Sequence, residues 1–379
     1  MTVRKKTGTA LLTLATVLAL PTAATAQNAL GANYNEHFED VDYGELDRAN
    51  AEWVRIFLPM PQVDRAGPAE HGAVKTILDA DRRGYKTILS LKFPYNRVQF
   101  PDADGPEFDR QLARLDAVLP LVMGKVDMLV IGNEPFIESR QQDWTPNFNK
   151  FYEKLARRAI AHRAANCGAN CKTRLYMGSF NRLWSPKWRT PTTERWMRFV
   201  KNTPEIEGVD IHPHVTTIEQ TKVFLDYVIP RMRPDQKFIA TEFSLIWWWK
   251  DHLKKPVPAA FATKYSIPAN TRNWQVIKAA LDQPFPKAKW DDFLALNPWF
   301  EDRKHYLANI MQMFRATGRL AVATYGFKQG RSMANNFGPE STPWLLNSVV
   351  AGRTIRKNAD GSSQFNYAWI DDFKTLQAK

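Results

Sequence analysis

The chain has 379 residues, of which 44% are hydrophobic and 24% are charged, and its formal net charge is +13. This composition is that of a globular protein and excludes disordered, collagen-like and low-complexity chains. Positive charge attracts nucleic acids and anionic polymers, but the sequence has no zinc finger, no RNP-like strand and no basic run longer than three residues. We therefore expect no nucleic-acid partner.

The first 26 residues have the pattern of a secretory signal peptide. Basic residues at positions 4–6 precede the apolar stretch Ala10–Leu20, and the small residues Ala24-Thr25-Ala26 follow it. The apolar stretch is too short to cross a bilayer as a helix, and the small residues match a cleavage site before Gln27. We expect an exported, monomeric protein, periplasmic or extracellular, without membrane insertion, whose residues 27–379 form a single domain.

The two cysteines are Cys167 and Cys171, four positions apart. In an oxidising compartment such a pair closes a small disulfide loop, and we expect this pairing. Two free surface thiols are the alternative. A zinc site is disfavoured because no histidine or further cysteine lies near them in the sequence.

Short apolar runs alternate with segments of helical periodicity along the whole chain. Near-continuous apolar runs are typical of strands that are buried on both faces. The runs predict eight strands, at Leu30–Tyr34, Trp53–Leu58, Lys86–Lys92, Met128–Gly132, Arg174–Gly178, Gly208–Ile211, Lys237–Thr241 and Leu320–Tyr325.

Helices are predicted between these strands. The clearest are Glu107–Met123, Phe148–Ala165, Thr217–Ile229 and Trp299–Ala316. Thr145-Pro146 and Thr342-Pro343 are typical of a helix start with proline in the first turn. Eight strand–helix units predict an α/β fold, a (β/α)₈ TIM barrel. The alternative is an open doubly wound sheet, which the absence of G-x-G-x-x-G and Walker motifs disfavours.

Two segments depart from this alternation. Residues 246–299, between the seventh and eighth strands, are rich in tryptophan and proline and contain a helical segment at Trp274–Leu281. We interpret them as a long loop insertion over the barrel mouth. In the tail, residues 356–379, the turn signal Asn358-Ala359-Asp360-Gly361 predicts a short terminal hairpin.

Two predicted strands each end in a glutamate. The fourth continues into Gly132-Asn133-Glu134-Pro135, and the seventh into Thr241-Glu242-Phe243. The C-terminal ends of barrel strands carry the active site, and a carboxylate there is costly unless it is paired or hydrogen-bonded. Two carboxylates facing each other across a barrel mouth suit glycoside hydrolysis, in which one donates a proton and the other attacks. A pair of structural, salt-bridged carboxylates is the alternative.

These two strand ends resemble those of the retaining glycoside hydrolases of clan A, which are barrel enzymes such as cellulases, mannanases and xylosidases. The resemblance covers residues 29–350 and rests on Asn133-Glu134-Pro135 and Glu242. It implies that Glu134 is the acid/base, that Glu242 is the nucleophile, and that Asn133 hydrogen-bonds the sugar 2-hydroxyl. It also implies an arginine that points at the nucleophile from the second strand, where Arg55 lies.

Departures from the clan pattern concern the sixth and eighth strands. Clan relatives commonly have a histidine followed by an aromatic residue on the sixth strand, where this chain has His212 and His214. A tryptophan floor is common after the eighth strand, where Tyr325 or Phe327 stands instead. We also expect contacts to substrate from Asn181 and Trp184 after the fifth strand. Of the three adjacent tryptophans, Trp247, Trp248 and Trp249, at least one is expected in the cleft; we select Trp247 and Trp248.

The sequence therefore predicts an exported retaining glycosidase that cleaves β-linked glycans, neutral or anionic, with Glu134 and Glu242, and needs neither a cofactor nor a metal. A transglycosylase would use the same two glutamates. A non-catalytic glycan-binding barrel would have lost one of them, and both are present. A metal-dependent hydrolase would carry His-x-His after the first strand, whereas residues 33–37 lack it.

Overall fold

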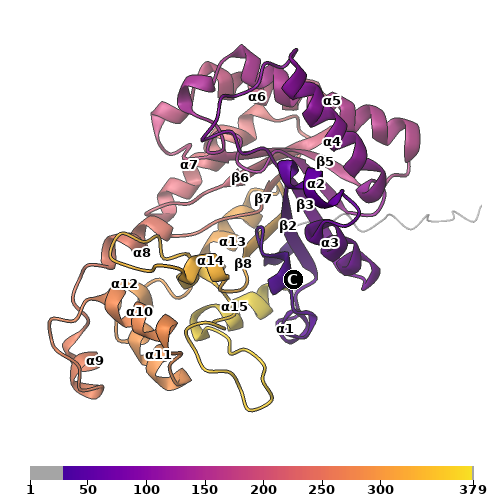
Figure 1. The fold of residues 1–379 in the computed structure, drawn as a ribbon. Coiled ribbons are helices and arrows are strands. Elements are labelled where there is room, and N and C mark those ends of the chain that lie inside the picture. The colour runs from indigo at the N-terminus through magenta and orange to yellow at the C-terminus, as the bar shows by residue number, and fades with distance from the viewer. Residues whose placement is uncertain (1–28, 378–379) are drawn as a thin grey trace, which may run out of the picture.

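The computed structural model describes residues 29–377, so the predicted signal peptide, residues 1–26, lies outside the described residues. Eight parallel strands close into a barrel in sequence order, with β8 paired to β1. Closure confirms the (β/α)₈ barrel and rules out the open sheet (Figure 1). The strands are β1 Ala29–Asn33, β2 Trp53–Pro59, β3 Lys86–Lys92, β4 Met128–Ile131, β5 Arg174–Asn181, β6 Ile206–His212, β7 Phe238–Ala240 and β8 Leu320–Gly326.

Helices surround the barrel. In chain order they are α1 Tyr43–Arg48, α2 Val63–Ala66, α3 Gly72–Arg82, α4 Pro106–Val122, α5 Pro146–Asn166, α6 Pro191–Asn202, α7 Ile218–Val228, α8 Ile246–His252, α9 Ala259–Lys264, α10 Asn273–Asp282, α11 Lys287–Ala295, α12 Pro298–Glu301, α13 Tyr306–Ala316, α14 Arg331–Ala334 and α15 Tyr367–Gln377. None of the helices described within 29–377 has both the length and the apolar character required to span a membrane.

Side chains along each strand point alternately into the barrel and out of it, as the two-residue strand period requires. A cluster of buried side chains from six strands fills the lower interior: Trp53, Ile88, Met128, Val130, Tyr176, Ile239 and Val322. The outward-facing apolar residues of the strands join a much larger cluster with the helices. Arg55 follows Trp53 on the same face of β2 and lies one layer higher, below the mouth.

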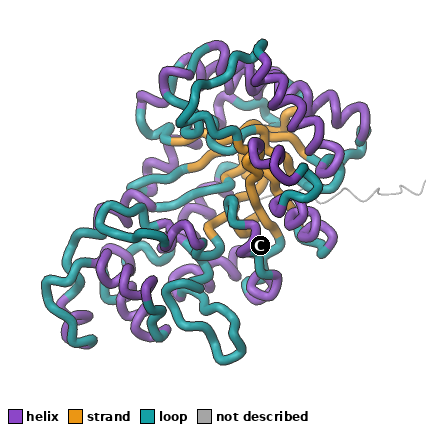
Figure 2. The backbone as a smooth tube through the Cα atoms, viewed as in Figure 1, coloured by secondary structure: helices purple, strands orange, loops and turns teal. Residues whose placement is uncertain are grey.

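The segment between β7 and β8 is helical rather than a long loop. It forms α8 to α12, short helices joined by loops (Figure 2), which lie together at the lower left of Figure 1. The predicted helix Trp299–Ala316 is divided into α12 and α13 by a turn at residues 302–305, where four polar residues follow one another. Of residues 246–299, only Trp247 lines the pocket at the barrel mouth.

The predicted turn forms, and Val350 pairs antiparallel with Phe365 outside it, but the last residues of the tail are helical and not a strand. Gly361 donates its backbone N–H to the carbonyl of Asn358, as a turn requires, and Asn358 donates its own N–H to the carbonyl of Ser362. The chain then forms α15, which packs against α13 and β1. Trp369, Phe373 and Leu376 repeat at helical spacing and are buried there. The outer faces of β8 and β1 need an apolar cover, and α15 supplies it. Pro343 likewise precedes a 3₁₀ turn, Trp344–Asn347, and not an α-helix.

Candidate active site

A pocket of about 290 Å³ opens at the C-terminal ends of the strands. Barrel enzymes carry their active sites at this end. Seven residues singled out in the sequence line it, namely Asn133, Glu134, Asn181, His212, His214, Glu242 and Trp247. Arg55 lies directly beneath, fully buried, and reaches the pocket through its contact with Glu242.

Glu134 reaches the pocket because the chain turns sharply after β4. Gly132 has a φ of 92°, in the left-handed region, and a Cβ on it would lie 2.7 Å from the ring of Pro135. Glycine is therefore required at this position. The turn directs both Asn133 and Glu134 toward the barrel axis, where they meet side chains from β5 and β6.

The two glutamates face each other closely. One carboxylate oxygen of Glu134, one of Glu242 and a ring nitrogen of each of His212 and His214 all lie within 4.8 Å of one another. The Glu134 side chain is 20% exposed and that of Glu242 is 11% exposed. Both carboxylates thus remain accessible to a small ligand while most of their surface is shielded from water.

Arg55 connects the two strand ends that carry the glutamates. Its Nη1 donates to Oε1 of Glu242 at 2.7 Å and to Oδ1 of Asn33 at 3.0 Å, and its Nη2 donates to Oδ1 of Asn133. Both Nε and Nη2 also donate to the hydroxyl of Ser90. The guanidinium thus has a rigid set of partners, which suits its planar fork of donors.

His212 is the second cation beside the glutamates. Its Nδ1 lies 3.1 Å from Oε1 of Glu134, and its Nε2 lies 2.8 Å from the hydroxyl of Thr241, which donates to Asp210. Burial alone lowers the pKa of His212, but the charges of Glu242 and Asp210 outweigh burial and raise it to about 10. An imidazolium donates from both nitrogens, so at neutral pH His212 donates to Glu134 and to Thr241.

These two cations determine the charge of the glutamates. Burial would raise the pKa of Glu242, but His212 and Arg55 hold it far below its usual value, so Glu242 is ionised at neutral pH. Burial also raises the pKa of Glu134, yet the hydrogen bond from His212 lowers it overall. The charge of Glu242 acts in the opposite direction and raises the pKa of Glu134.

His214 occupies the position where the resemblance implies an aromatic residue. Its Nε2 lies 3.5 Å from Oε2 of Glu242, and its Nδ1 lies 2.8 Å from the hydroxyl of Ser244. The indole of Trp344 meets the ring edge-to-face at 4.9 Å. His214 therefore approaches one carboxylate oxygen of Glu242 while Arg55 donates to the other, and His214 is itself held by two neighbours.

Two asparagines are hydrogen-bonded to the same network. Asn181 donates from Nδ2 to Oε1 of Glu134 at 2.6 Å. Asn133 accepts from Arg55 and donates to Oε1 of Glu138 at 2.9 Å, and its side chain is almost fully buried. These bonds fix which end of the Asn133 amide is oxygen and which is nitrogen.

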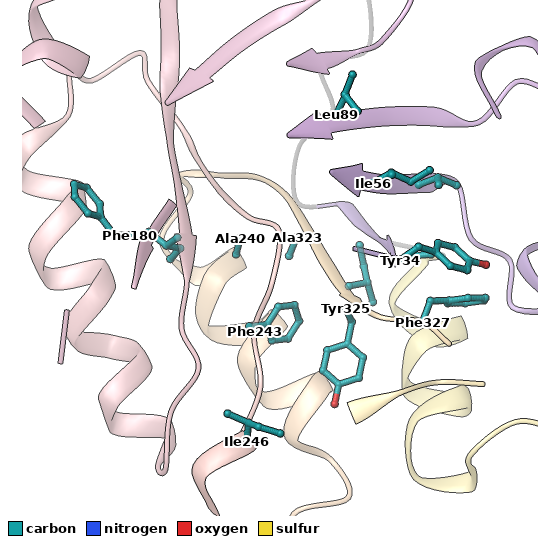
Figure 3. Packing of buried hydrophobic residues seen from close by; sticks show 14 of the residues in the cluster. Tyr34, Ile56, Leu89, Phe180, Ala240, Phe243, Ile246, Ala323, Tyr325 and Phe327 are labelled. Carbon is teal, nitrogen blue, oxygen red and sulfur yellow. The ribbon is translucent and has the colours of Figure 1, made fainter. Parts of the chain in front are cut away.

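Three of the residues expected in the pocket lie elsewhere. Tyr325 is fully buried on the outer face of β8, 5.1 Å from the ring of Phe243 (Figure 3). Because Val322 packs inside the barrel, the strand period directs Tyr325 outward. Trp248 donates from Nε1 to the backbone of Trp299 at 2.8 Å. Trp184 packs against the hydrophobic core and does not line the pocket.

Several pocket residues were not singled out in the sequence. Trp344 occupies the place expected for Tyr325 or Phe327, but it comes from the 3₁₀ turn well after β8, where no strand signal identifies it. Arg182 follows Asn181 at the end of β5. Two adjacent polar residues at a strand end were the sequence signal that could have identified it. The rest of the lining comes from Asn35, Glu36, His37, Phe57, Lys92, Ile137, Ser332 and Met333.

The four clustered side chains also have the geometry of a cation site. Their charge state disfavours it, because the protonated His212 has no lone pair to offer and Arg55 already donates to Glu242. Far from the pocket, Cys167 and Cys171 form a disulfide with a Cα–Cα distance of 5.2 Å.

No protein-family model and no curated protein matches the chain in sequence. Among solved structures it is similar to the catalytic domain of a mannanase from Streptomyces sp. SirexAA-E, with 11% identity and a TM-score of 0.48 over 97% of this chain and 96% of that one. An endo-β-1,4-glucanase from Xanthomonas axonopodis pv. citri has 13% identity and a TM-score of 0.47 over 93% and 99%. A GH26-CBM35 β-(1,4)-mannanase from Podospora anserina has 9% identity and a TM-score of 0.40 over 93% of this chain, which spans 64% of that longer chain. Two of these three solved structures are mannanases and one is an endo-β-1,4-glucanase.

Proposed function

We propose that this protein is a retaining glycoside hydrolase of β-linked glycans, with Glu242 as nucleophile and Glu134 as acid/base. One observation carries the proposal: an oxygen of each carboxylate lies within 4.8 Å of the other in the pocket. Retaining glycosidases have carboxyl groups about 5–5.5 Å apart, whereas inverting ones need about 6.5–9.5 Å to admit a water molecule. The short separation favours attack by the carboxylate itself.

The charge state of Glu242 supports its role as nucleophile. A nucleophile must be ionised, and Arg55 and His212 keep Glu242 so. In the first step Glu242 attacks the anomeric carbon, and Glu134 protonates the departing oxygen. In the resting protein the proton for this step is held on His212, whose Nδ1 lies 3.1 Å from Glu134. Sharing of this proton between His212 and Glu134 supplies the acid form.

The remaining pocket residues have roles around this reaction. Asn133, held by Arg55 and Glu138, presents its amide at the pocket wall and is our candidate for the sugar 2-hydroxyl. The indole of Trp247 lines the pocket and can stack on a pyranose face. We further propose that the protein acts outside the cytoplasm, which the disulfide supports because such bonds persist in oxidising compartments.

The test is hydrolysis of β-linked oligosaccharides and aryl β-glycosides by wild type, Glu134→Ala, Glu242→Ala and the exposed control Glu205→Gln. We expect Glu134→Ala to lose about 10²- to 10⁴-fold in kcat/KM on unactivated substrates. Glu242→Ala should lose at least as much, and the control nothing. Early product anomers, read by NMR, should retain the β configuration; with acceptor sugars present, transfer products would identify a transglycosylase.

Azide separates chemical roles from structural ones. With an activated aryl glycoside, azide should restore turnover of Glu134→Ala and give a β-glycosyl azide, because the covalent intermediate then needs no base. With Glu242→Ala it should give the α-glycosyl azide by direct displacement. Inverted hydrolysis products from wild type, or full activity in both alanine variants, would remove the assignment.

A further inference from the structure

Arg182 stands at the end of β5, next to Asn181, and lines the pocket. Its backbone is left-handed, with a φ of 52°, and its carbonyl accepts a turn hydrogen bond from Ser185. Asparagine or glycine adopts this conformation at less cost than a long side chain. An arginine at this position suggests that its side chain has a use in the pocket.

The guanidinium lies against two indole rings. Its central carbon is 5.2 Å from the ring centre of Trp188 and 5.6 Å from that of Trp247, which also lines the pocket. Stacking on aromatic rings holds the guanidinium plane without using its N–H donors, which point outward in that plane. The side chain is therefore oriented but not satisfied.

Arg182 has no carboxylate partner among the residues that the structure describes, and its guanidinium makes no hydrogen bond to any of them. The other long cation of the pocket, Lys92, has two: Glu36 at 3.8 Å and Glu138 at 4.0 Å. Arg182 is also only partly exposed. A shielded, oriented and unpaired guanidinium on a pocket wall is a ready binding group for an anion.

We propose that Arg182 binds the carboxylate of a uronate residue, so that the preferred substrate is an acidic β-linked glycan. The guanidinium fork matches a carboxylate with two parallel hydrogen bonds. Its neighbour Asn181 donates to Glu134, which locates the bound acidic sugar beside the bond that Glu134 protonates. The formal net charge of +13 favours approach of an acidic polymer. This inference rests on the proposed glycosidase function and specifies its substrate class.

The test compares acidic probes with their neutral counterparts. Oligosaccharides of alginate, hyaluronan and glucuronoxylan, each beside its carboxyl-reduced form, are titrated calorimetrically into Glu242→Gln and into Glu242→Gln/Arg182→Met. We expect at least one acidic probe to bind Glu242→Gln about tenfold or more tightly than its reduced form. The added Arg182→Met change should weaken that probe about 10- to 100-fold and its reduced form less than about threefold.

Two further variants control for packing and charge. Arg182→Lys keeps the charge but lacks the fork, and we expect intermediate affinity for the acidic probe; it also serves if methionine disturbs folding. Arg157 stacks on Phe199 in the same manner but is exposed outside the pocket, so Arg157→Met should change neither affinity.

Each other outcome overturns a specific statement. If acidic and reduced probes bind Glu242→Gln equally, or if Arg182→Met weakens both equally, Arg182 is a packing residue and the inference fails. If wild type then still cleaves neutral glycans in a manner that depends on Glu134 and Glu242, the proposed function stands alone. If no probe, acidic or neutral, is bound or cleaved, the proposed function fails and this inference with it.

Discussion

Replacing Glu138 by glutamine should stabilise the protein relative to wild type at pH 8. At pH 4 the gain over wild type should be much smaller. Glu138 is 3% exposed, and its Oε1 accepts from Asn133 at 2.9 Å. Its Oε2 has no hydrogen-bond partner among the described residues, and Lys92 approaches only to 4.0 Å. Burial therefore dominates over Lys92 and Asn133 and raises the pKa of Glu138 from 4.5 to about 7.

The magnitude follows from proton linkage. A folded pKa of about 7 against 4.5 in the unfolded chain corresponds to about 3 kcal/mol, at about 1.36 kcal/mol per pKa unit. Because the folded protein binds this proton more tightly, stability from this group is complete below pH 4.5, declines between pH 4.5 and 7, and is lost above pH 7. Glutamine resembles the protonated form at every pH and avoids this decline.

Urea unfolding of wild type and Glu138→Gln from pH 4 to pH 8 measures the effect. The unfolding free energy of the variant minus that of wild type should rise by about 3 kcal/mol across this range. Taking the difference cancels the titration of all other groups that the substitution does not touch. The exposed Glu205→Gln change should give a flat difference. A flat difference for Glu138→Gln as well would refute the argument that burial controls this carboxyl.

Two more substitutions test the site and its boundary. Arg55→Met removes one partner of a buried ion pair and should cost about 3–5 kcal/mol in urea unfolding. It should also raise the pKa of Glu242, so that activity is lost at a higher pH on acidification; an unchanged acid limb of the pH–rate profile would contradict this. Tyr325→Phe should keep kcat/KM within about twofold in the same assay, because Tyr325 faces the helices and not the pocket.

The site was predictable where it depended on strand ends. All eight strands formed where apolar runs predicted them, because a parallel strand buried on both faces leaves a local signal that a single sequence carries. Closure of the barrel then brings their C-terminal ends together, whatever lies between them. Glu134 and Glu242 meet for this reason, although they lie far apart in the sequence. Arg55 was identifiable as a charge within an apolar strand that had to find a partner.

The errors arose where position depends on packing over longer distances. Side chains alternate in direction along a strand, and Val322 lies inside the barrel. Tyr325, three positions later, therefore points outward. Trp344 enters the pocket from a loop after β8, and no local pattern fixes where a loop folds back. The tail formed α15 because the seam between β8 and β1 lacked a helix, a requirement of the closed barrel and not of residues 367–377 alone.

Under the proposed mechanism, the arrangement of charges explains how one residue serves as acid and then as base. In the free protein the charge of Glu242 raises the pKa of Glu134, opposing the hydrogen bond from His212. Formation of the glycosyl ester removes that charge, while Arg55 and His212 remain beside the site. The pKa of Glu134 must then fall further, which favours its ionised form in the step where it activates water. The loss of the Glu242 charge, which completes the first step, therefore prepares Glu134 to act as base in the second.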